Sequence, residues 1–296
     1  MVTVTVPATS ANLGPGFDTL GIALGLYNRI SFEETDAELE ITGCPPQYAN
    51  GDNLAVLAFD AALEAAGKKR KDCGKGLRIG IQADIPVSRG LGSSAAMLAA
   101  GAIAANRLYN CGLDNDSLLA ICCSIEGHPD NLAPAFLGGL TAAFMKDGVP
   151  ITARFTVSET LRFYALVPAF ETSTAEARAV LPKTVPFGDA VFNVSRAVML
   201  IKALETGDTE LLKEACEDRL HQPWRKALLF GYDRVKQAAL SSGASGFMIS
   251  GSGSACLCVS AADIGQNLAR GLSGAEREWK VIPLEVDRQG ARVDKE

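Results

Sequence analysis

The sequence predicts an α+β fold in two domains, because strand-like and helix-like segments follow one another without the strict alternation of a doubly wound sheet. The chain has 296 residues, which is long for one hydrophobic core and comfortable for two. A turn-rich stretch between Lys146 and Glu159 separates two halves of different pattern. We therefore expect one domain over residues 1–155 and a second over residues 156–296.

The amino-terminal half begins with a strand and contains the helix start that matters most for function. Val2, Val4 and Val6 alternate with threonines, which indicates a strand that we expect to end at Pro7. The segments expected next are an apolar run, a helix closed by Gly67, a second strand and a helix of small residues, at residues 20–32, 52–66, 77–85 and 95–109. A further helix from about residue 116 leads to Glu126, and a short strand follows two glycines at 138–139.

The carboxyl-terminal half combines an early strand with a group of helices. An apolar strand is expected over residues 161–168, and helical patterns cover residues 189–205, 208–220 and 224–242. Two late strands flank a Gly/Ser-rich segment at residues 250–254, and a last helix and strand follow. Strands mixed with helices, without strict alternation, support the α+β interpretation.

Charge and hydropathy exclude several classes of protein. The chain carries 28 basic and 34 acidic side chains, a net charge of −6, which argues against a surface that collects nucleic-acid phosphates. The first residues lack the basic flank and apolar stretch of a signal peptide. The most apolar run, residues 95–105, is shorter than the roughly 20 residues of a membrane-spanning helix. We expect a cytoplasmic protein that binds neither nucleic acid nor membrane.

The eight cysteines predict neither disulfides nor a zinc site. No Cys-x-x-Cys pair occurs, and the chain has only two histidines. We interpret the cysteines as reduced thiols packed as small hydrophobic residues.

A Gly-x-Gly-Ser-Ser turn between a strand and a helix, at residues 90–94, is the main functional signal. The first amides of a helix have no internal partners, and the helix dipole places partial positive charge there. Glycines let a phosphate approach the backbone, and serine hydroxyls add donors or a metal ligand. The alternative interpretation is a tight strand-to-helix turn capped by serine.

Two better-known phosphate-binding loops fit this segment less well. The Walker A loop requires Gly-Lys-Ser/Thr, which occurs nowhere in the chain. Residues 90–95 formally match the dinucleotide pattern Gly-x-Gly-x-x-Ala, but residues 86–89 intervene between strand and glycine. The acids at a suitable distance, Asp114 and Asp116, fall where a helix begins instead of at the end of a strand.

Three long segments, residues 7–18, 86–96 and 246–254, resemble the GHMP kinase superfamily and occur in its order. Within that superfamily, Glu-Gly-His-Pro-Asp-Asn at 126–131 and the segments 173–182 and 218–225 are similar to the homoserine kinases. Two departures are visible. Ser254 stands where a proline is common, and the loop between Glu126 and His128 is shorter than in some relatives.

The resemblance implies an amino-terminal domain like ribosomal protein S5, a ferredoxin-like carboxyl-terminal domain, and ATP bound in the first. It assigns the phosphate loop to Pro86, Val87, Ser88, Arg89, Gly90, Leu91, Gly92, Ser93, Ser94, Ala95 and Ala96. It implies that Ser94 and Glu126 hold Mg²⁺, which suits the preference of this ion for oxygen ligands. Asn53 resembles the adenine contact of the family, and Thr174 its contact to the γ-phosphate.

The resemblance also implies an acceptor site for homoserine between the domains. Asn12 and Asp18 match the ammonium-binding residues of the family, and Arg178 and Arg225 match its carboxylate clamp. Arginine suits this role because its planar fork makes two hydrogen bonds to a carboxylate.

The remaining expectations concern catalysis and assembly. His128 is implied in the acceptor pocket, and Asp130 is a candidate base, by resemblance to mevalonate kinases. A dedicated base is not required, because phosphoryl transfer can rest on positioning and charge neutralisation. Many relatives are homodimers, so a homodimer is expected.

Three other functions remain open from the sequence. The first is a kinase of the same fold for another small alcohol such as mevalonate. The second is a non-catalytic sensor that binds ATP and a metabolite. The third, less favoured, is an oxidoreductase that uses a dinucleotide.

Overall fold

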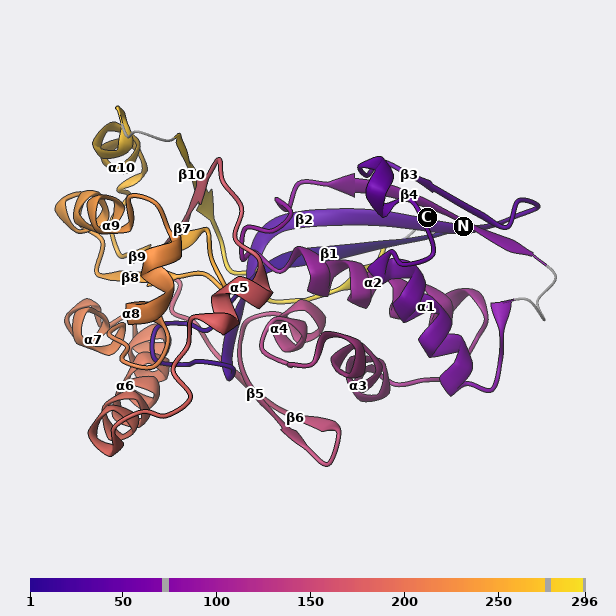
Figure 1. Ribbon diagram of the computed structural model, residues 1–296, viewed down its shortest axis with the longest axis horizontal. Coiled ribbons are helices and arrows are strands. Elements are labelled where there is room, and N and C mark those ends of the chain that lie inside the picture. Colours follow the sequence, from indigo (N-terminus) through magenta and orange to yellow (C-terminus); the bar gives the residue numbers. More distant parts are fainter. Residues whose placement is uncertain (71–74, 275–277, 295–296) are drawn as a thin grey trace.

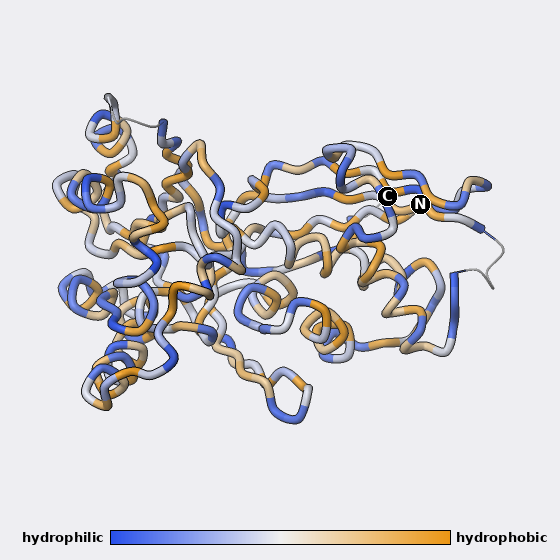
Figure 2. The backbone as a smooth tube through the Cα atoms, viewed as in Figure 1, coloured by the Kyte–Doolittle hydropathy of each residue, from blue (hydrophilic) through white to orange (hydrophobic). Residues whose placement is uncertain are grey.

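The computed structural model describes residues 1–70, 75–274 and 278–294, which form two β-sheets side by side with helices packed against each (Figure 1). The described residues are thus of mixed α+β type, as predicted from the sequence. The strands and the helices beneath them are largely hydrophobic, whereas the outer loops at the end of the first sheet are hydrophilic (Figure 2).

The first sheet is built mainly from the amino-terminal half. Its strands are β1 (Val2–Ala11), β2 (Leu20–Thr35), β3 (Leu39–Thr42), β4 (Gly76–Ala83), β5 (Leu140–Lys146), β6 (Val149–Phe155) and β11 (Arg292–Val293). They lie in the order β11-β1-β2-β4-β3, and β5 pairs with both β2 and β6. The β1–β2 pair is antiparallel, and β3 runs parallel to β4.

The first strand does not end at Pro7, as the sequence suggested, but continues to Ala11. The register against β2 shifts between Pro7 and Ala8, and this irregularity accommodates a residue that has no N–H to donate to the ladder. The extension carries Ser10 and Ala11, both buried, toward the second sheet.

Helices α1 (Leu54–Ala65), α2 (Ser93–Leu108), α3 (Asn115–Glu126) and α4 (Leu132–Leu137) lie on one side of the first sheet (Figure 1). Helix α2 is rich in alanine and almost fully buried, so small side chains bring it close to its neighbours. A Cβ added at Gly101 of α2 would lie 2.1 Å from the backbone oxygen of Ala55 in α1. Glycine at 101 is therefore required by the close approach of the two helices.

The second sheet lies in the carboxyl-terminal half and is antiparallel. Its strands are β7 (Arg162–Pro168), β8 (Gly246–Ile249), β9 (Cys256–Ser260) and β10 (Trp279–Leu284), in the order β10-β7-β9-β8. Helices α9 (Tyr232–Ser241) and α10 (Gly265–Leu272) pack on it through a cluster that includes Leu268, Val235 and Phe247. Between β7 and α9 the chain forms α5 (Thr174–Ala179), α6 (Phe187–Thr206), α7 (Thr209–Ala215), α8 (Gln222–Arg225) and a 3₁₀ turn at Lys226–Leu228.

Two further expectations about elements were wrong in detail. The single helix expected over residues 224–242 is divided into α8, the 3₁₀ turn and α9, because Gly231 adopts a left-handed conformation with φ of 77° before α9. The turn-rich stretch between Lys146 and Glu159 contains strand β6, which pairs with β5 as a hairpin. Strand β6 is mostly exposed and contains Pro150, a residue uncommon within strands, so its sequence did not indicate a strand.

The end of the described chain returns to the first sheet. The amide of Gly25 donates to Glu285 O at 2.8 Å, and the amide of Asp287 donates to Ala23 O at 3.0 Å. Strand β11 then pairs with β1, with Val4 opposite Val293. The division into residues 1–155 and 156–296 stays a prediction, since the last strand of the first sheet comes from the second of these ranges.

In the described ranges, no helix combines the length and apolar composition needed to cross a membrane. The seven cysteines in those ranges are free thiols, and Cys73 lies outside them, as does Lys71 of the basic run at 68–71. No group of three His, Cys, Asp or Glu side chains among the described residues is arranged to hold a metal ion.

We expect Gly101→Ala to destabilise the protein by about 2 kcal/mol or more, because the added methyl group overlaps the backbone of α1. Gly188→Ala, in α6, is the matched control: nothing lies within 4 Å of its added Cβ. The control should be neutral or stabilising by up to about 1 kcal/mol, since alanine favours a helix over glycine. Urea unfolding of the two variants measures the difference, and equal stabilities would contradict the close α1–α2 contact.

Candidate active site

The first strand, the glycine-serine loop and the late glycine-serine segment meet at one point. Three backbone hydrogen bonds join them: Thr9 N–H to Leu91 O at 3.1 Å, Gly251 N–H to Ala11 O at 2.9 Å, and Ala255 N–H to Arg89 O at 3.0 Å. The buried Ser250 hydroxyl also lies 2.7 Å from Gly90 O. Segments from both sheets therefore build one backbone platform at the start of α2.

The two glycines of the loop are required by this packing. Gly92, the N-cap of α2, adopts a left-handed φ of 72°, and a Cβ there would lie 1.9 Å from Thr9 Oγ1. Gly90 has the same φ, and its Cβ would lie 2.1 Å from Ser250 O. Because Gly92 offers no side chain as a cap, the first amides of α2 are left for an external acceptor.

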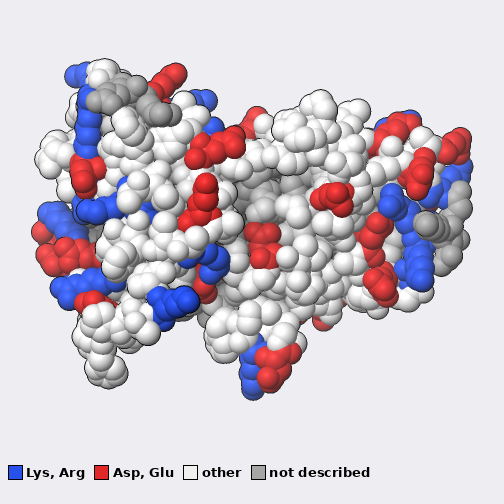
Figure 3. All heavy atoms as spheres, viewed as in Figure 1, with Lys and Arg blue, Asp and Glu red and all other residues white. Residues whose placement is uncertain are grey.

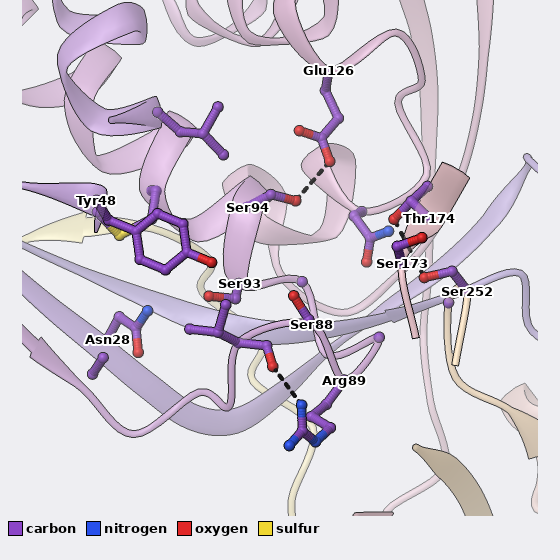
Figure 4. A pocket seen from close by; sticks show the side chains of 18 of the residues that line it. Asn28, Tyr48, Ser88, Arg89, Ser93, Ser94, Glu126, Ser173, Thr174 and Ser252 are labelled. Carbon is purple, nitrogen blue, oxygen red and sulfur yellow. Dashed lines mark hydrogen bonds between the residues drawn. The ribbon is translucent and has the colours of Figure 1, made fainter. Parts of the chain in front are cut away.

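A cavity of about 450 Å³ opens beside this platform, between the two sheets. Figure 4 shows Asn28 and Tyr48 at one end of it and Glu126, Thr174 and Ser252 at the other, with the start of α2 between them. On the face shown in Figure 3, the molecule is hollowed between its two parts, and acidic side chains are exposed in and beside the hollow. Phosphate binding in this hollow would therefore depend on backbone donors more than on lysine charge.

The structure distributes the predicted loop residues between cavity and core. The residues that line the cavity are Val87, Ser88, Arg89, Gly90, Gly92, Ser93 and Ser94. Leu91, Ala95 and Ala96 are buried beneath them, and Pro86 is half-buried. The Arg89 guanidinium is committed to structure, because it donates to the backbone oxygens of Pro168 and Ala169, each at 3.0 Å.

Ser94 and Glu126, the predicted metal ligands, are brought together. The Ser94 hydroxyl donates to Glu126 Oε1 at 2.7 Å, from the first turn of α2 to the last residue of α3 (Figure 4). Gly127, in a left-handed conformation, ends α3 directly after Glu126. Two hard oxygen donors thus stand beside the unpartnered amides of α2.

The predicted ammonium and carboxylate sites are joined to each other. Asn12 Oδ1 accepts a hydrogen bond from the backbone amide of Asp18 at 2.8 Å, which holds the turn that carries both residues. The Asp18 carboxylate forms a two-pronged ion pair with Arg178, with N–O distances of 2.9 and 3.1 Å. About a third of each of these side chains is exposed, so the pair is accessible to solvent. Each partner presently neutralises the other.

Arg225 lies deeper, with only 1% of its surface exposed. Its guanidinium donates to Ala177 O and Gly251 O, each at 3.1 Å, and its Nη1 lies 3.3 Å from His221 Nδ1. Among the described residues it forms no ion pair with a carboxylate. Burial and the neighbouring Arg178 charge lower the pKa of Arg225 to about 10, so it remains a cation at neutral pH.

His128 and Asp130 form a hydrogen-bonded pair between α3 and α4. His128 Nδ1 lies 2.7 Å from Asp130 Oδ1, which also accepts from the backbone amide of Asn131 at 3.0 Å. The hydrogen bond to Asp130 is the main cause that raises the pKa of His128, against partial burial. His128 lines the cavity, whereas the buried Asp130 lies behind it.

A second, smaller cavity of about 350 Å³ adjoins the first through Glu126, His128 and Arg178. Asp18 lines it, and exposed Phe144 and Met145 of β5 form its apolar wall. The predicted acceptor residues thus converge around this junction, with Arg225 below in the larger cavity.

Asn53 and Thr174 lie in the cavity, but each also has a local partner. The Asn53 side chain caps α1 by accepting from Ala55 N at 3.0 Å and donates to Tyr48 O at 2.8 Å. Thr174 begins α5, and its hydroxyl lies 3.4 Å from that of Ser252 (Figure 4). Asn53 therefore keeps one amide hydrogen for a ligand.

Sequence reasoning missed several residues of this cavity. Ser252 and Asn131 lie within sequence motifs that the resemblance identified, so they could have been predicted as cavity residues from those motifs. Asn28, Tyr48 and Thr172 belong to no recognised motif. A lone polar residue in a strand, turn or loop carries no pattern that identifies it as part of a site.

Comparison with known proteins agrees with this architecture. Residues 53–139 match the GHMP kinases N terminal domain, and residues 200–274 match the GHMP kinases C terminal domain. A homoserine kinase from Clostridium botulinum is 41% identical over 99% of both chains. A solved homoserine kinase from Cytophaga hutchinsonii superposes with a TM-score of 0.87 at 30% identity, covering 99% of this chain and 97% of that one.

A mevalonate kinase from L. major superposes with a TM-score of 0.74 at 16% identity, covering 97% of this chain and 96% of that one, which shows a shared fold alone. The fold and the glycine-serine platform therefore define a GHMP kinase, as the sequence resemblance implied. The full-length identity is more specific. The chain belongs to the homoserine kinase family.

We expect the two histidines to titrate in opposite directions. His128 should titrate above its ordinary pKa near 6.5, because Asp130 stabilises its cation. Burial lowers the pKa of His221, whose Nε2 lies 2.7 Å from Gly14 O. The stability that the His128 cation contributes is therefore complete below pH 6.5 and is lost as pH rises through the raised pKa.

Imidazole NMR titration measures both pKa values directly. Asp130→Asn should return the His128 resonance toward or below its ordinary value and leave that of His221 unchanged. A wild-type His128 that titrates below 6.5 would contradict the charged pair.

Proposed function

We propose that the protein is a cytoplasmic kinase that transfers the γ-phosphoryl group of ATP to the side-chain hydroxyl of L-homoserine, giving ADP and O-phospho-L-homoserine. The observation that carries this proposal is the placement of α2's free amides beside an opposed charge pair, Asp18 and Arg178. Free thiols at all seven described cysteines support a reducing compartment.

The nucleotide end of the site is supplied mainly by backbone. We propose that the phosphates rest against the first amides of α2, where the helix dipole favours negative charge, with Thr174 and Ser252 facing the terminal phosphate. Ser94 and Glu126 would hold Mg²⁺ together with phosphate oxygens, since Mg²⁺ sites on nucleotides use one or two protein ligands. That ion neutralises charge on the phosphates when it is bound.

The acceptor end fits a zwitterion. An amino acid can replace both partners of the Asp18–Arg178 ion pair at once, with its ammonium group on Asp18 and its carboxylate on Arg178. Arg225 adds a buried cation that has no carboxylate partner among the described residues. A neutral alcohol would break the ion pair without restoring it, so these contacts select amino acids.

Phosphoryl transfer at the junction of the two cavities does not require a strong general acid or base. The acceptor oxygen bonds to the γ-phosphorus as the bond to the bridging oxygen breaks and ADP leaves, and the hydroxyl proton can pass late to an oxygen of the transferred phosphoryl group. Asp130 is buried behind His128, so we propose it as a positioning residue that orients the imidazole and not as the base.

The decisive experiment is an ADP-release assay with homoserine, mevalonate, serine, threonine and galactose in parallel. We expect turnover with homoserine far above the others. Asp18→Asn should lower kcat/KM for homoserine by roughly 10- to 100-fold, because a charge-assisted contact to the ammonium group is lost. Asp116→Asn, an exposed acid of α3, is the control that should leave the rate unchanged. Faster turnover of mevalonate, or none with any alcohol, would overturn the proposal.

We also propose that the protein is a homodimer, with α6 at its interface. Four apolar side chains form one exposed face of this helix: Phe187, Val191, Val194 and Val198, exposed by 86, 53, 68 and 61%. Apolar stripes of this kind on soluble proteins mark interaction sites. A two-fold axis would pack α6 antiparallel against α6 of the second copy. The apolar side chains of each stripe would then be buried against the same apolar side chains of the other.

Light scattering after gel filtration tests this interface. Wild type should elute with twice the chain mass, and Val194→Asp should shift it to the monomer. Val149→Asp, on exposed strand β6, is the matched control and should remain dimeric. A monomeric wild type, or a Val194→Asp variant that stays dimeric, would contradict the assignment.

A further inference from the structure

A buried amide in the cavity has no hydrogen-bond partner for its donor. Asn28 lies in the middle of β2 with 1% of its surface exposed, and it lines the cavity. Its side-chain nitrogen Nδ2 has no partner. An unsatisfied buried donor is costly, and native proteins rarely keep one without a reason.

The orientation of this amide is fixed by its other end. Asn28 Oδ1 accepts a hydrogen bond from the backbone amide of Ile85 at 3.0 Å, and Asn28 is paired with Ala83 of β4. A flipped amide would place two N–H donors against the N–H of Ile85. Nδ2 is therefore the unpartnered end of this cavity-lining side chain, and it can only donate.

The surroundings of Nδ2 suit a flat, largely apolar ring. Figure 4 shows Asn28 and Tyr48 at the end of the cavity that is remote from Glu126, Thr174 and Ser252. The lining of the cavity includes the uncharged residues Cys44, Pro45, Leu54, Ile81 and Met97, together with the acid Asp52. Phosphates held at the start of α2 would direct the base of a nucleotide toward this end.

We propose that Asn28 Nδ2 donates a hydrogen bond to a ring nitrogen of the purine base of the bound nucleotide. A purine carries acceptor nitrogens at N1, N3 and N7, and such an acceptor satisfies the buried Nδ2 donor of Asn28. This inference rests on the proposed function and deepens it, because it adds a base-reading residue beside Asn53, whose side chain already caps α1 and donates to Tyr48 O.

Asn28→Asp separates this role from a structural one. The aspartate keeps an oxygen for the amide of Ile85 but replaces the donor with an acceptor. The Kd for ATP should rise about tenfold or more, with KM for homoserine little changed. Asn115→Asp, at the exposed start of α3, is the control for the added charge and should bind ATP as wild type does. Thermal unfolding reports whether each variant folds.

Deaza analogues identify the acceptor atom and need no variant. Calorimetry with 1-deaza-, 3-deaza- and 7-deaza-ATP on wild type should show one analogue that binds about tenfold more weakly than ATP. That difference should vanish in Asn28→Asp, or in Asn28→Ser if the aspartate prevents folding. Unchanged ATP binding by the folded variant overturns the inference. The inference is also overturned if wild type binds all three analogues as tightly as ATP. It is overturned as well if wild type and variant lose the same affinity for an analogue.

The failure of this inference can be distinguished from that of the proposed function. A wild type that binds ATP and phosphorylates homoserine, but shows no coupling between Asn28 and a ring nitrogen, refutes the base contact alone. A wild type that does not bind ATP refutes both.

Discussion

The site depends on the contact between two backbone loops that belong to different sheets. Ser250, just after β8, lies with its hydroxyl 2.8 Å from Ser10 Oγ and 2.7 Å from Gly90 O. Strand β1 of the first sheet ends at this point, next to Gly90 of the glycine-serine loop. Because the contact is made by backbone and two short serine side chains, it leaves little freedom between the walls of the cavity. The proposed nucleotide and acceptor ends are therefore fixed in one frame.

The arginines of the site differ in the partners that they already have. Arg89, the cation of the loop, is used to hold backbone oxygens at the end of β7. The acceptor side instead has two arginines in different states: Arg178 paired and partly exposed, Arg225 buried without a carboxylate partner among the described residues. An exposed ion pair contributes little stability, so separating it costs little, whereas a buried cation gains much from an incoming carboxylate. Arg178 is therefore the arginine that can change its partner, and Arg225 is the one that backbone oxygens hold in place.

How far the sequence could predict this molecule differs from one feature to the next. The loop at residues 90–94 was recognisable as a candidate phosphate site because its glycines, its serines and the helix start are contiguous in the sequence. The continuation of β1 past Pro7 was not, because it depends on a register shift against β2. Motif resemblance named Asp18 and Arg178 but not their ion pair, which spans 160 residues of sequence. Asn28 gave no signal, since an unpartnered amide is a property of packing.

The return of the chain to the first sheet bears on how the protein is made. Val293 pairs with Val4, so strand β1 is synthesised long before the strand that covers this edge. Strands so distant in sequence pair slowly, because closing the long loop between them costs chain entropy before any hydrogen bond of the pair has formed. During synthesis β1 therefore exposes an unpaired edge, the kind of surface on which nascent chains associate wrongly and which chaperones shield.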